Sequence, residues 1–278
     1  MRLSIITINY NNAEGLRQTL ASVAMQTCRD IEHIIIDGGS KDGSAEVIKD
    51  YVRQLEIEDW NLENVKWVSE SDKGIYDAMN RGIKKASGEY LYFLNSGDTL
   101  AAEQVVERLY KELESGEEDI IVSCINFTDA SGVYHANYQK RMSKISLFHY
   151  LQTGIPHQSA LIHRSLFTQY GLYDLQYHIV ADWEFFLRAL VLNKASLRYT
   201  DLTIANFDGT GLTSTHGKEM GEEIEKVMHD TFPERVLEDY KWMQASGSDL
   251  RRMEWLQAHP FMHRLVQTIV GLGRRISK

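Results

Sequence analysis

Three carboxylates follow three hydrophobic stretches of the chain. Asp37 ends "IEHIIID", Asp72 follows "VKWVSES" and Asp98 follows "YLYFLNSG". Short apolar runs bounded by turn-forming residues are typical of strands, and open α/β sheets bind ligands outside the carboxyl ends of their strands. Like charges at one sheet edge repel unless a cation or hydrogen-bond donors lie among them. The spacing therefore predicts a site for a cation and a polar ligand, the alternative being that each residue only forms a turn.

Other polar residues accompany these carboxylates. The first predicted strand ends in Thr7, Asn9 and Tyr10, and the fourth runs into Asn95 and Ser96. Turn chemistry explains each residue singly, but it explains less well why polar groups recur at four strand ends. No GxGxxG or GxxxxGK[ST] motif follows any predicted strand, so the Gly-rich modes of phosphate binding are unsupported. A metal ion that holds the phosphates is the natural substitute.

Strands and helices must alternate to bring these residues together, and the first half of the sequence predicts that they do. The apolar pattern indicates strands at 3–10, 31–39, 65–71, 90–94 and 119–124, with helices at 11–26, 47–55, 75–86 and 105–113. Alternation at this pitch is typical of βαβ units. The sequence therefore predicts an α/β fold, a Rossmann-like and mainly parallel sheet flanked by helices.

Composition excludes several classes of protein. A net charge of −9 over 278 residues argues against nucleic acid as the main partner, because phosphate binding needs a basic surface. Two cysteines in apolar surroundings, Cys28 and Cys124, favour neither a disulfide framework nor a thiolate metal site. No apolar run approaches the roughly 18 residues of a spanning helix, and the apolar stretch near the N-terminus is shorter than that of a signal peptide. We expect a cytoplasmic protein.

The second half contains candidates for the chemistry itself. Residues 157–163 read as a strand, and His157 at its start either faces the site or packs as an ordinary histidine. "VADWEFFLR" reads as a helix with Asp182 in its first turn, where a carboxylate commonly serves as an N-cap or favours the helix dipole. The Gly- and Thr-rich loop 206–219 is a candidate lid.

Four segments in series resemble family 2 inverting glycosyltransferases with the GT-A fold, of the bacterial cell-surface polysaccharide type. The segments are "LSIITINYNNAEGLRQTLASVAMQ", "EHIIIDGGSKDGS", "SESDKGIYDAMNRGIKKASGEYLYFLNSGD" and "VADWEFFLR". The resemblance covers roughly residues 1–215 in the family's order and spacing. It implies a glycosyltransferase domain at 1–215, with a nucleotide-sugar-binding half at 1–125 and an acceptor half at 126–215.

The resemblance also implies roles for individual residues. Asp37 would accept a hydrogen bond from the base, Asp98 would bind Mn²⁺ or Mg²⁺, and Asp182 would be the general base. His216 is a candidate for the metal shell, as loop histidines are in some family members; an ordinary exposed loop histidine is the alternative. The remaining nucleotide-sugar-binding residues would be Thr7, Asn9, Tyr10, Asp72, Lys73, Asp77, Asn95 and Ser96.

Two departures from the family pattern affect these roles. The metal motif usually carries a second carboxylate, whereas here Asp98 is alone in "NSGD". One carboxylate and two diphosphate oxygens still suit Mg²⁺ or Mn²⁺, so we expect the ion to arrive with the nucleotide. In the family's Glu-Asp pair the leading Glu is replaced by Ala181, while Asp182 is present.

Residues 216–278 are predicted to form a helical C-terminal extension. "GKEMGEEIEKVMHDTF" reads as an acidic amphipathic helix. In 261–278, apolar residues fall on one helical face and basic residues on the other, a pattern that suits an anionic membrane surface. The alternative is a helix docked on its own domain or within a homo-oligomer. The protein would then lie in the cytoplasm or peripherally on the inner face of the membrane.

Taken with the resemblance, these features predict a metal-dependent inverting glycosyltransferase. It would move a hexosyl or N-acetylhexosaminyl group from a nucleotide-diphosphate sugar, UDP-sugar first, to a glycan or lipid-linked acceptor in cell-surface polysaccharide synthesis. One alternative is a non-catalytic sugar-nucleotide-binding protein, which the single metal carboxylate and the missing Glu would suit. The other is a sugar nucleotidyltransferase, but "NYNNAEG" lacks the basic Gly-rich loop that such an enzyme needs after its first strand.

Overall fold

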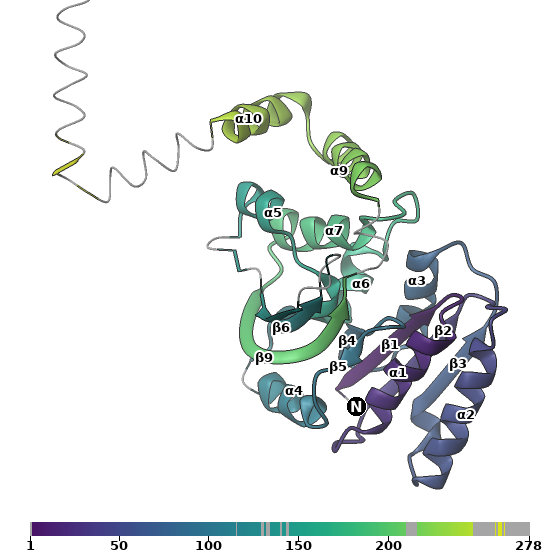
Figure 1. Ribbon diagram of the computed structural model, residues 1–278. Helices are drawn as coiled ribbons and strands as arrows, with labels where there is room; N and C mark the ends of the chain where they lie inside the picture. The colour runs from purple at the N-terminus through teal and green to yellow at the C-terminus, as the bar shows by residue number, and fades with distance from the viewer. Residues whose placement is uncertain are drawn as a thin grey trace, which may run out of the picture. The chain divides into compact units, whose positions relative to one another are not determined.

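The computed structural model consists of two compact units, residues 1–224 and 225–278 (Figure 1). It describes residues 2–114, 116–128, 131, 134–139, 141–142, 145–209, 216–246, 259, 261–262 and 264. The first unit contains every candidate site residue. Its described strands form one sheet in the order β3-β2-β1-β4-β8-β6-β9-β5, with β7 paired to β6.

The amino-terminal half of the first unit is the parallel part of this sheet. Its strands are β1 (Leu3–Asn9), β2 (Glu32–Asp37), β3 (Val65–Ser69) and β4 (Tyr90–Phe93), and its helices are α1 (Ala13–Ala24), α2 (Ser44–Ile57) and α3 (Ile75–Lys85), with a short 3₁₀ helix η1 at Leu62–Asn64. All three strand pairs are parallel, and Asn9 lies opposite Asp37, which lies opposite Ser69. The polar ends of neighbouring strands therefore meet at one edge, as the alternation predicts.

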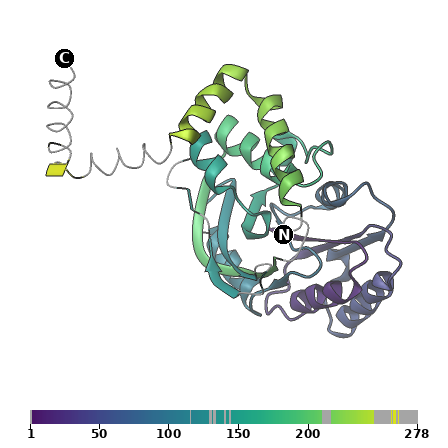
Figure 2. The same ribbon diagram turned by 45° about the horizontal axis from the view of Figure 1, so that its top comes forward.

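The sheet changes character beyond β4. The elements that follow are β5 (Thr99–Leu100), α4 (Val105–Glu114), β6 (Ile120–Thr128), β7 (Tyr134–Tyr138), α5 (Leu147–Thr153), η2 (His157–Ser159), β8 (Ala160–His163), α6 (Ser165–Tyr170), α7 (Ala181–Phe186), the π-helix η3 (Leu187–Leu192) and β9 (Leu197–Asp208). β8 enters between β4 and β6 and is antiparallel to both, while the long strands β6 and β9 lie side by side in parallel (Figure 2). The α/β fold class is confirmed: β1 to β4 pair in parallel, and β6 and β9 form a further parallel pair.

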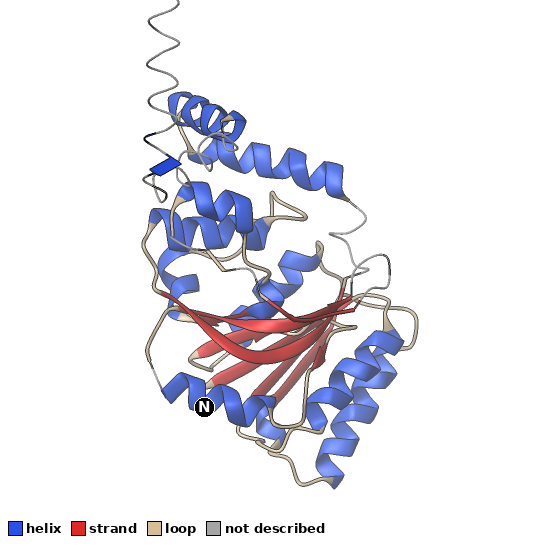
Figure 3. Ribbon diagram, turned by 60° about the vertical axis from the view of Figure 1, so that its left-hand side comes forward, coloured by secondary structure: helices blue, strands red, loops and turns tan. Residues whose placement is uncertain are grey.

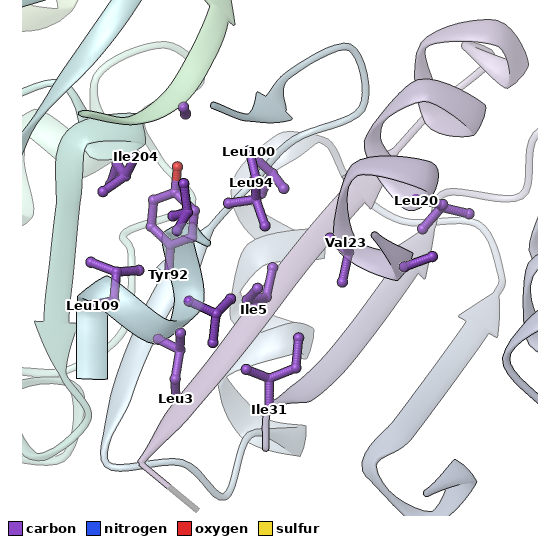
Figure 4. Close-up of a cluster of buried hydrophobic side chains, with 14 of the residues drawn as sticks. Leu3, Ile5, Leu20, Val23, Ile31, Tyr92, Leu94, Leu100, Leu109 and Ile204 are labelled. Carbon is purple, nitrogen blue, oxygen red and sulfur yellow. The ribbon is translucent and has the colours of Figure 1, made fainter. Parts of the chain in front are cut away.

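Helices cover both faces of this curled sheet (Figure 3). On one face Ile5 of β1 and Tyr92 of β4 share a buried cluster with Leu20 of α1 and Leu109 of α4 (Figure 4). On the other face α3 contacts β1 and β2. A Cβ atom on Gly82 would lie only 2.4 Å from Cγ2 of Ile6, so glycine allows this close approach. β1, β2 and β4 are buried on both faces, which explains their nearly continuous apolar sequence.

The carboxyl-terminal part contains the helices α9 (Gly217–Thr231) and α10 (Glu234–Ala245). The predicted acidic helix corresponds to α9, which begins in the first unit and ends in the second. The domain boundary at residue 215 stays a prediction. The predicted basic amphipathic helix at 261–278 lies, apart from three positions, outside the described residues. Among the residues that are described, no helix has the length and apolar character needed to cross a membrane.

Candidate active site

Asp37 ties together the ends of three strands. Its Oδ1 accepts hydrogen bonds from Asn9 Nδ2 at 2.7 Å and Ser40 Oγ at 2.6 Å, and its Oδ2 accepts from Ser40 N at 3.0 Å and Ser69 Oγ at 2.6 Å. Burial alone would raise the pKa of Asp37, but these bonds outweigh it and hold the pKa below its usual value. The side chain is fully buried, so in this structure Asp37 shapes the sheet edge, and direct contact with a base stays a prediction.

Tyr10 and Asp72 flank the backbone of Gly38 at the same edge. A Cβ atom on Gly38 would lie 2.6 Å from Asp72 Oδ2 and 3.1 Å from Tyr10 Cδ2. Tyr10 is 67% exposed, so an aromatic face and a carboxylate lie together where a flat ligand with an N–H donor can bind. Thr7 instead lies beneath this surface, fully buried, with its hydroxyl 3.0 Å from His33 Nε2.

Lys73 and Asp77 lie at the start of α3. Asp77 Oδ2 accepts a hydrogen bond from Lys73 N at 3.1 Å and forms an ion pair with Arg81 at 3.0 Å. Asp72 Oδ1 accepts from Gly74 N at 2.9 Å. These bonds satisfy the backbone amides of the two residues that precede α3. Asp77 therefore organises the loop that carries Asp72, and the Lys73 side chain is exposed beside it.

Helix α1 holds the loop 95–98 through its backbone. Thr19 Oγ1 accepts from Gly97 N at 3.0 Å and donates to Asp98 O at 2.7 Å. Asn12 Nδ2 donates to Ser96 O at 3.2 Å. Gly97 has a φ of 104°, a backbone conformation that glycine adopts at little cost. Hydrogen bonds from α1 and its N-cap therefore fix the backbone of the loop 95–98 at the end of β4.

Two side chains of this loop offer oxygen atoms of the kind that bind a hard divalent cation. Asp98 is buried, with 4% of its surface exposed, and Asn95 Oδ1 is buried with no hydrogen-bond partner among the described residues. Mg²⁺ and Mn²⁺ prefer oxygen ligands of this kind. Within the described part of the chain, however, no three His, Cys, Asp or Glu side chains gather as metal ligands. The role of His216 stays a prediction.

Asp182 receives hydrogen bonds from three directions. Its Oδ1 accepts from Tyr76 OH at 2.7 Å and from Trp183 N at 2.9 Å, and its Oδ2 lies 2.6 Å from His157 Nδ1. The N-cap of α7 is Val180, so Asp182 is not an N-cap. Burial would raise the pKa of Asp182, but the contact with His157 and the bonds from Tyr76 and Trp183 lower it below its ordinary value. Asp182 is therefore an ionised carboxylate with 15% of its side chain exposed.

His157 connects Asp182 to the loop 95–98. Its Nε2 lies 3.1 Å from Asn95 Nδ2, while Nδ1 faces Asp182. A neutral imidazole donates from one nitrogen and accepts at the other, and the amide of Asn95 can only donate here. With Asn95 Nδ2 as the donor to Nε2, the neutral ring of His157 donates a hydrogen bond from Nδ1 to Asp182.

The start of α7 is anchored by a glutamate from α9. Glu223 accepts hydrogen bonds from His178 N and Ile179 N, both at 2.8 Å, and from Val180 N at 3.2 Å. Sequence reasoning missed Glu223 and Tyr76 and left His157 open. Only the apolar spacing of its helix bears on Tyr76, and that spacing cannot distinguish a packed tyrosine from one whose hydroxyl binds a carboxylate.

The fold and this edge of polar groups define a glycosyltransferase. The chain belongs to glycosyl transferase family 2, whose model matches residues 4–171. This membership confirms the family resemblance and the enzyme class. An uncharacterized glycosyltransferase of Mycobacterium tuberculosis is 37% identical over 221 residues, which cover 76% of this chain and 77% of that protein. A PGL/p-HBAD biosynthesis glycosyltransferase of Mycobacterium bovis is 31% identical over 214 residues, covering 75% and 77%.

Solved structures share the fold. S. aureus TarS 1–349 in complex with UDP-GlcNAc superposes with a TM-score of 0.61 at 18% identity, over 78% of this chain and 61% of that one. The mannosyltransferase PcManGT from Pyrobaculum calidifontis, in complex with GDP-Man and Mn²⁺, gives 0.55 at 16% identity, over 74% and 56%. The chain thus spans less than two thirds of either structure.

Proposed function

We propose that this glycosyltransferase moves a hexosyl or N-acetylhexosaminyl group, with inversion, from a nucleotide-diphosphate sugar to a hydroxyl of a glycan or lipid-linked acceptor. One observation carries the proposal: an ionised, mostly buried carboxylate, Asp182, is linked through His157 to the loop 95–98 at the end of β4. A proton acceptor is therefore held beside the edge where the parallel half of the sheet would bind the donor.

The reaction is a single displacement. The acceptor oxygen forms a bond to the anomeric carbon while the bond from that carbon to the diphosphate oxygen breaks, and the hydroxyl proton passes to Asp182. Tyr76 supports both protonation states of this carboxylate. Its hydroxyl lies 2.7 Å from Asp182 Oδ1 and 2.7 Å from Ile179 O but has one hydrogen to give. It donates to the ionised carboxylate, and it can accept from the protonated one while donating to Ile179 O.

The donor half supports a nucleotide ligand. Tyr10 offers an exposed ring and Asp72 a carboxylate beside it, a pair suited to a flat base with an N–H group. Asn9 Oδ1 and Asn95 Oδ1 are buried acceptors without partners among the described residues, and ligand hydroxyls would satisfy them. The structural neighbour TarS 1–349 was solved in complex with UDP-GlcNAc, which makes a UDP-sugar the first donor to test.

Asp98 and Asn95 are the residues that would hold a divalent cation. When bound, Mn²⁺ or Mg²⁺ would stabilise the negative charge that develops on the departing diphosphate. The structural neighbour PcManGT was solved in complex with GDP-Man and Mn²⁺, which supports this choice. The acceptor class rests on the relatives named for PGL/p-HBAD biosynthesis and on the basic pattern of 261–278, which would bring the enzyme to a membrane carrying a lipid-linked acceptor.

A thermal-shift screen followed by a transfer assay tests the proposal. We expect UDP and UDP-sugars to raise the unfolding temperature only when Mn²⁺ or Mg²⁺ is present, and UDP release to depend on added acceptor. Ligand-induced stabilisation grows with the ratio of ligand concentration to Kd, so tight binding is easily seen. Binding without turnover over a broad acceptor library would indicate a sugar-nucleotide-binding protein, and a flat response to every nucleotide would sink the proposal.

A further inference from the structure

We propose that His157 is a positioning residue that couples the donor loop 95–98 to the general base Asp182. This inference rests on the proposed function. The three side chains come from separate elements, namely the loop after β4 (Asn95), η2 (His157) and α7 (Asp182), yet they form one chain of contacts of 3.1 Å and 2.6 Å. His157 is 9% exposed and Asp182 15% exposed as side chains, so water competes little with either contact.

The coupling follows from how a neutral imidazole distributes its proton. With Asn95 Nδ2 donating to Nε2, the ring proton must lie on Nδ1 and point at Asp182. If the amide of Asn95 turned over, its oxygen would face Nε2 and draw the ring proton there. Asp182 Oδ2 would then face an unprotonated Nδ1 at 2.6 Å, which is a repulsive contact between two acceptors. The orientation of the Asn95 amide therefore decides whether Asp182 Oδ2 has a donor, while Oδ1 keeps its bonds from Tyr76 and Trp183.

A bound donor would fix that orientation. Asn95 Oδ1 has no hydrogen-bond partner among the described residues, so it is free to accept from a donor hydroxyl or to bind the cation of a nucleotide complex. Either contact keeps Nδ2 on His157. A bound donor would thereby strengthen a geometry that this structure already has, and it would couple proton removal to the presence of a sugar to transfer.

The surroundings of His157 keep the ring in this geometry. Phe93 of β4 meets it edge to face at a centroid distance of 6.4 Å. Pro156 precedes it and accepts hydrogen bonds from Ser159 N at 3.0 Å and Ser159 Oγ at 2.8 Å. The Phe93 ring therefore restricts movement of the imidazole, and the bonds to the Pro156 carbonyl restrict movement of the backbone that carries it.

Two substitutions separate the two bonds of the ring. In His157→Asn the amide nitrogen can take the place of Nδ1 and still donate to Asp182. In His157→Gln the amide reaches the place of Nε2, near Asn95, and the donor to Asp182 is lost. We expect His157→Gln to lower kcat roughly 10–100-fold, the effect of losing one hydrogen bond to a charged group, with donor KM nearly unchanged. His157→Asn should retain most of the wild-type kcat.

A double-mutant cycle distinguishes positioning from a general structural role. If His157 acts through Asp182, then His157→Gln should cost nothing further in an Asp182→Asn background. Equal losses of kcat in both backgrounds, or a wild-type kcat for His157→Gln, would overturn the inference. If the wild-type enzyme transfers sugar and Asp182→Asn does not, the proposed function stands whatever His157 does.

A spectroscopic test needs no turnover. Nitrogen-15 NMR of the histidine rings should show His157 of the free protein as the neutral tautomer with its proton on Nδ1. In Asn95→Ala this preference should weaken, because Nε2 loses its donor. A ring protonated on Nε2 in the wild type, or no change in Asn95→Ala, would contradict the coupling even if no sugar donor had been found.

Discussion

Asp37 and Asp182 differ in their hydrogen-bond partners and in their exposure, and these differences indicate different roles. Asp37 uses both oxygens on Asn9, Ser40 and Ser69 and is fully buried, so it organises the sheet edge. Asp182 is also held by donors, but it keeps an exposed fraction beside the loop 95–98. Similar positions at the ends of elements therefore give different roles, which the hydrogen-bond partners decide.

The first residue-scale prediction concerns Asp182. Asn has nearly the same shape but cannot take a proton, so Asp182→Asn should lower transfer roughly 10²–10⁴-fold. Donor affinity should change little, because the residues proposed to bind the nucleotide are others. Glu184→Gln is the matched control, since Glu184 lies on the same helix with its carboxylate bound to Arg188. Turnover and UDP affinity measured on both variants decide the matter: wild-type transfer by Asp182→Asn would place the base elsewhere.

The second residue-scale prediction concerns Tyr76. Its hydrogen bond is one of those that lower the pKa of Asp182, so Tyr76→Phe should raise that pKa. Because the base must be ionised, the acid limb of the kcat profile should move to higher pH, with kcat at neutral pH reduced roughly threefold to tenfold. Tyr173→Phe is the control, because the Tyr173 ring packs on Tyr76 while its hydroxyl has no partner among the described residues.

Two results would count against this role of Tyr76. An unmoved acid limb in Tyr76→Phe would show that the hydroxyl does not act on Asp182. An equal shift in Tyr173→Phe would attribute the effect to packing rather than to the hydrogen bond.

The sequence predicted the positions of the site residues at the strand ends better than it predicted their hydrogen bonds. The apolar runs and turn residues predicted that Asn9, Asp37 and the loop 95–98 follow strands of one mainly parallel sheet, because the alternation of strands and helices is visible in local patterns. They gave no account of the contact between His157 and Asp182, which joins residues 25 positions apart through a fold-dependent approach. A rotamer and its partners depend on packing that no local pattern records.

At the scale of elements, a side chain of α9 holds the start of α7 in position. The amides of residues 178–180 precede the helix and point at Glu223 of α9. Sequence predicted the helix "VADWEFFLR", but not this anchor, because its partner lies more than 40 residues away. Ala181 stands where the family's pair has its Glu, and the carboxylate of Glu223 in α9 binds the backbone just before this position.

Glu223→Gln should loosen the start of α7. Gln offers one acceptor oxygen, and its amide N–H₂ would face at least one backbone N–H. We expect faster hydrogen exchange at residues 178–180 and a loss of about 1–3 kcal/mol in the free energy of unfolding. We also expect a lower kcat, because Asp182 lies only two residues after Val180. Glu222→Gln is the matched control on the same helix, since Glu222 makes an exposed pair with Lys218, and such pairs contribute little. Unchanged exchange at 178–180 in Glu223→Gln would refute the anchor.

At the scale of the whole molecule, the first unit joins a parallel half to a mixed half. The parallel half follows from alternating patterns, since βαβ units have few alternative topologies. The position of β8 between β4 and β6 does not follow from the sequence, because it sets residues 160–163 beside strands some 40 and 70 positions earlier, and nothing local selects that pairing. This insertion also carries His157 to the end of β4, so the less predictable half of the sheet completes the site.

Buried ionisable groups link the stability of this fold to pH, and His33 should dominate above pH 5. His33 lies between Thr7 Oγ1 at 3.0 Å and Tyr51 OH at 2.8 Å, and burial lowers its pKa from 6.5 to about 3. Below pH 6.5 the unfolded chain binds a proton at this residue that the folded chain does not. Stability is therefore fully present above pH 6.5 and falls as the pH decreases towards 3. The buried carboxylates with lowered pKa, Glu32, Asp37 and Asp182, add their losses only below about pH 4.5.

Urea unfolding at pH 7, 6 and 5 tests this assignment. The wild type should lose about 2 kcal/mol between pH 7 and pH 5 through His33 alone. In His33→Gln that slope should largely vanish, because the amide can still bond to Thr7 and Tyr51 but does not titrate; the steeper fall at lower pH should remain. His178→Gln, which removes an exposed histidine, should leave the wild-type slope intact. A slope that persists in His33→Gln would show that another group, and not the buried His33, sets the acid sensitivity of the fold.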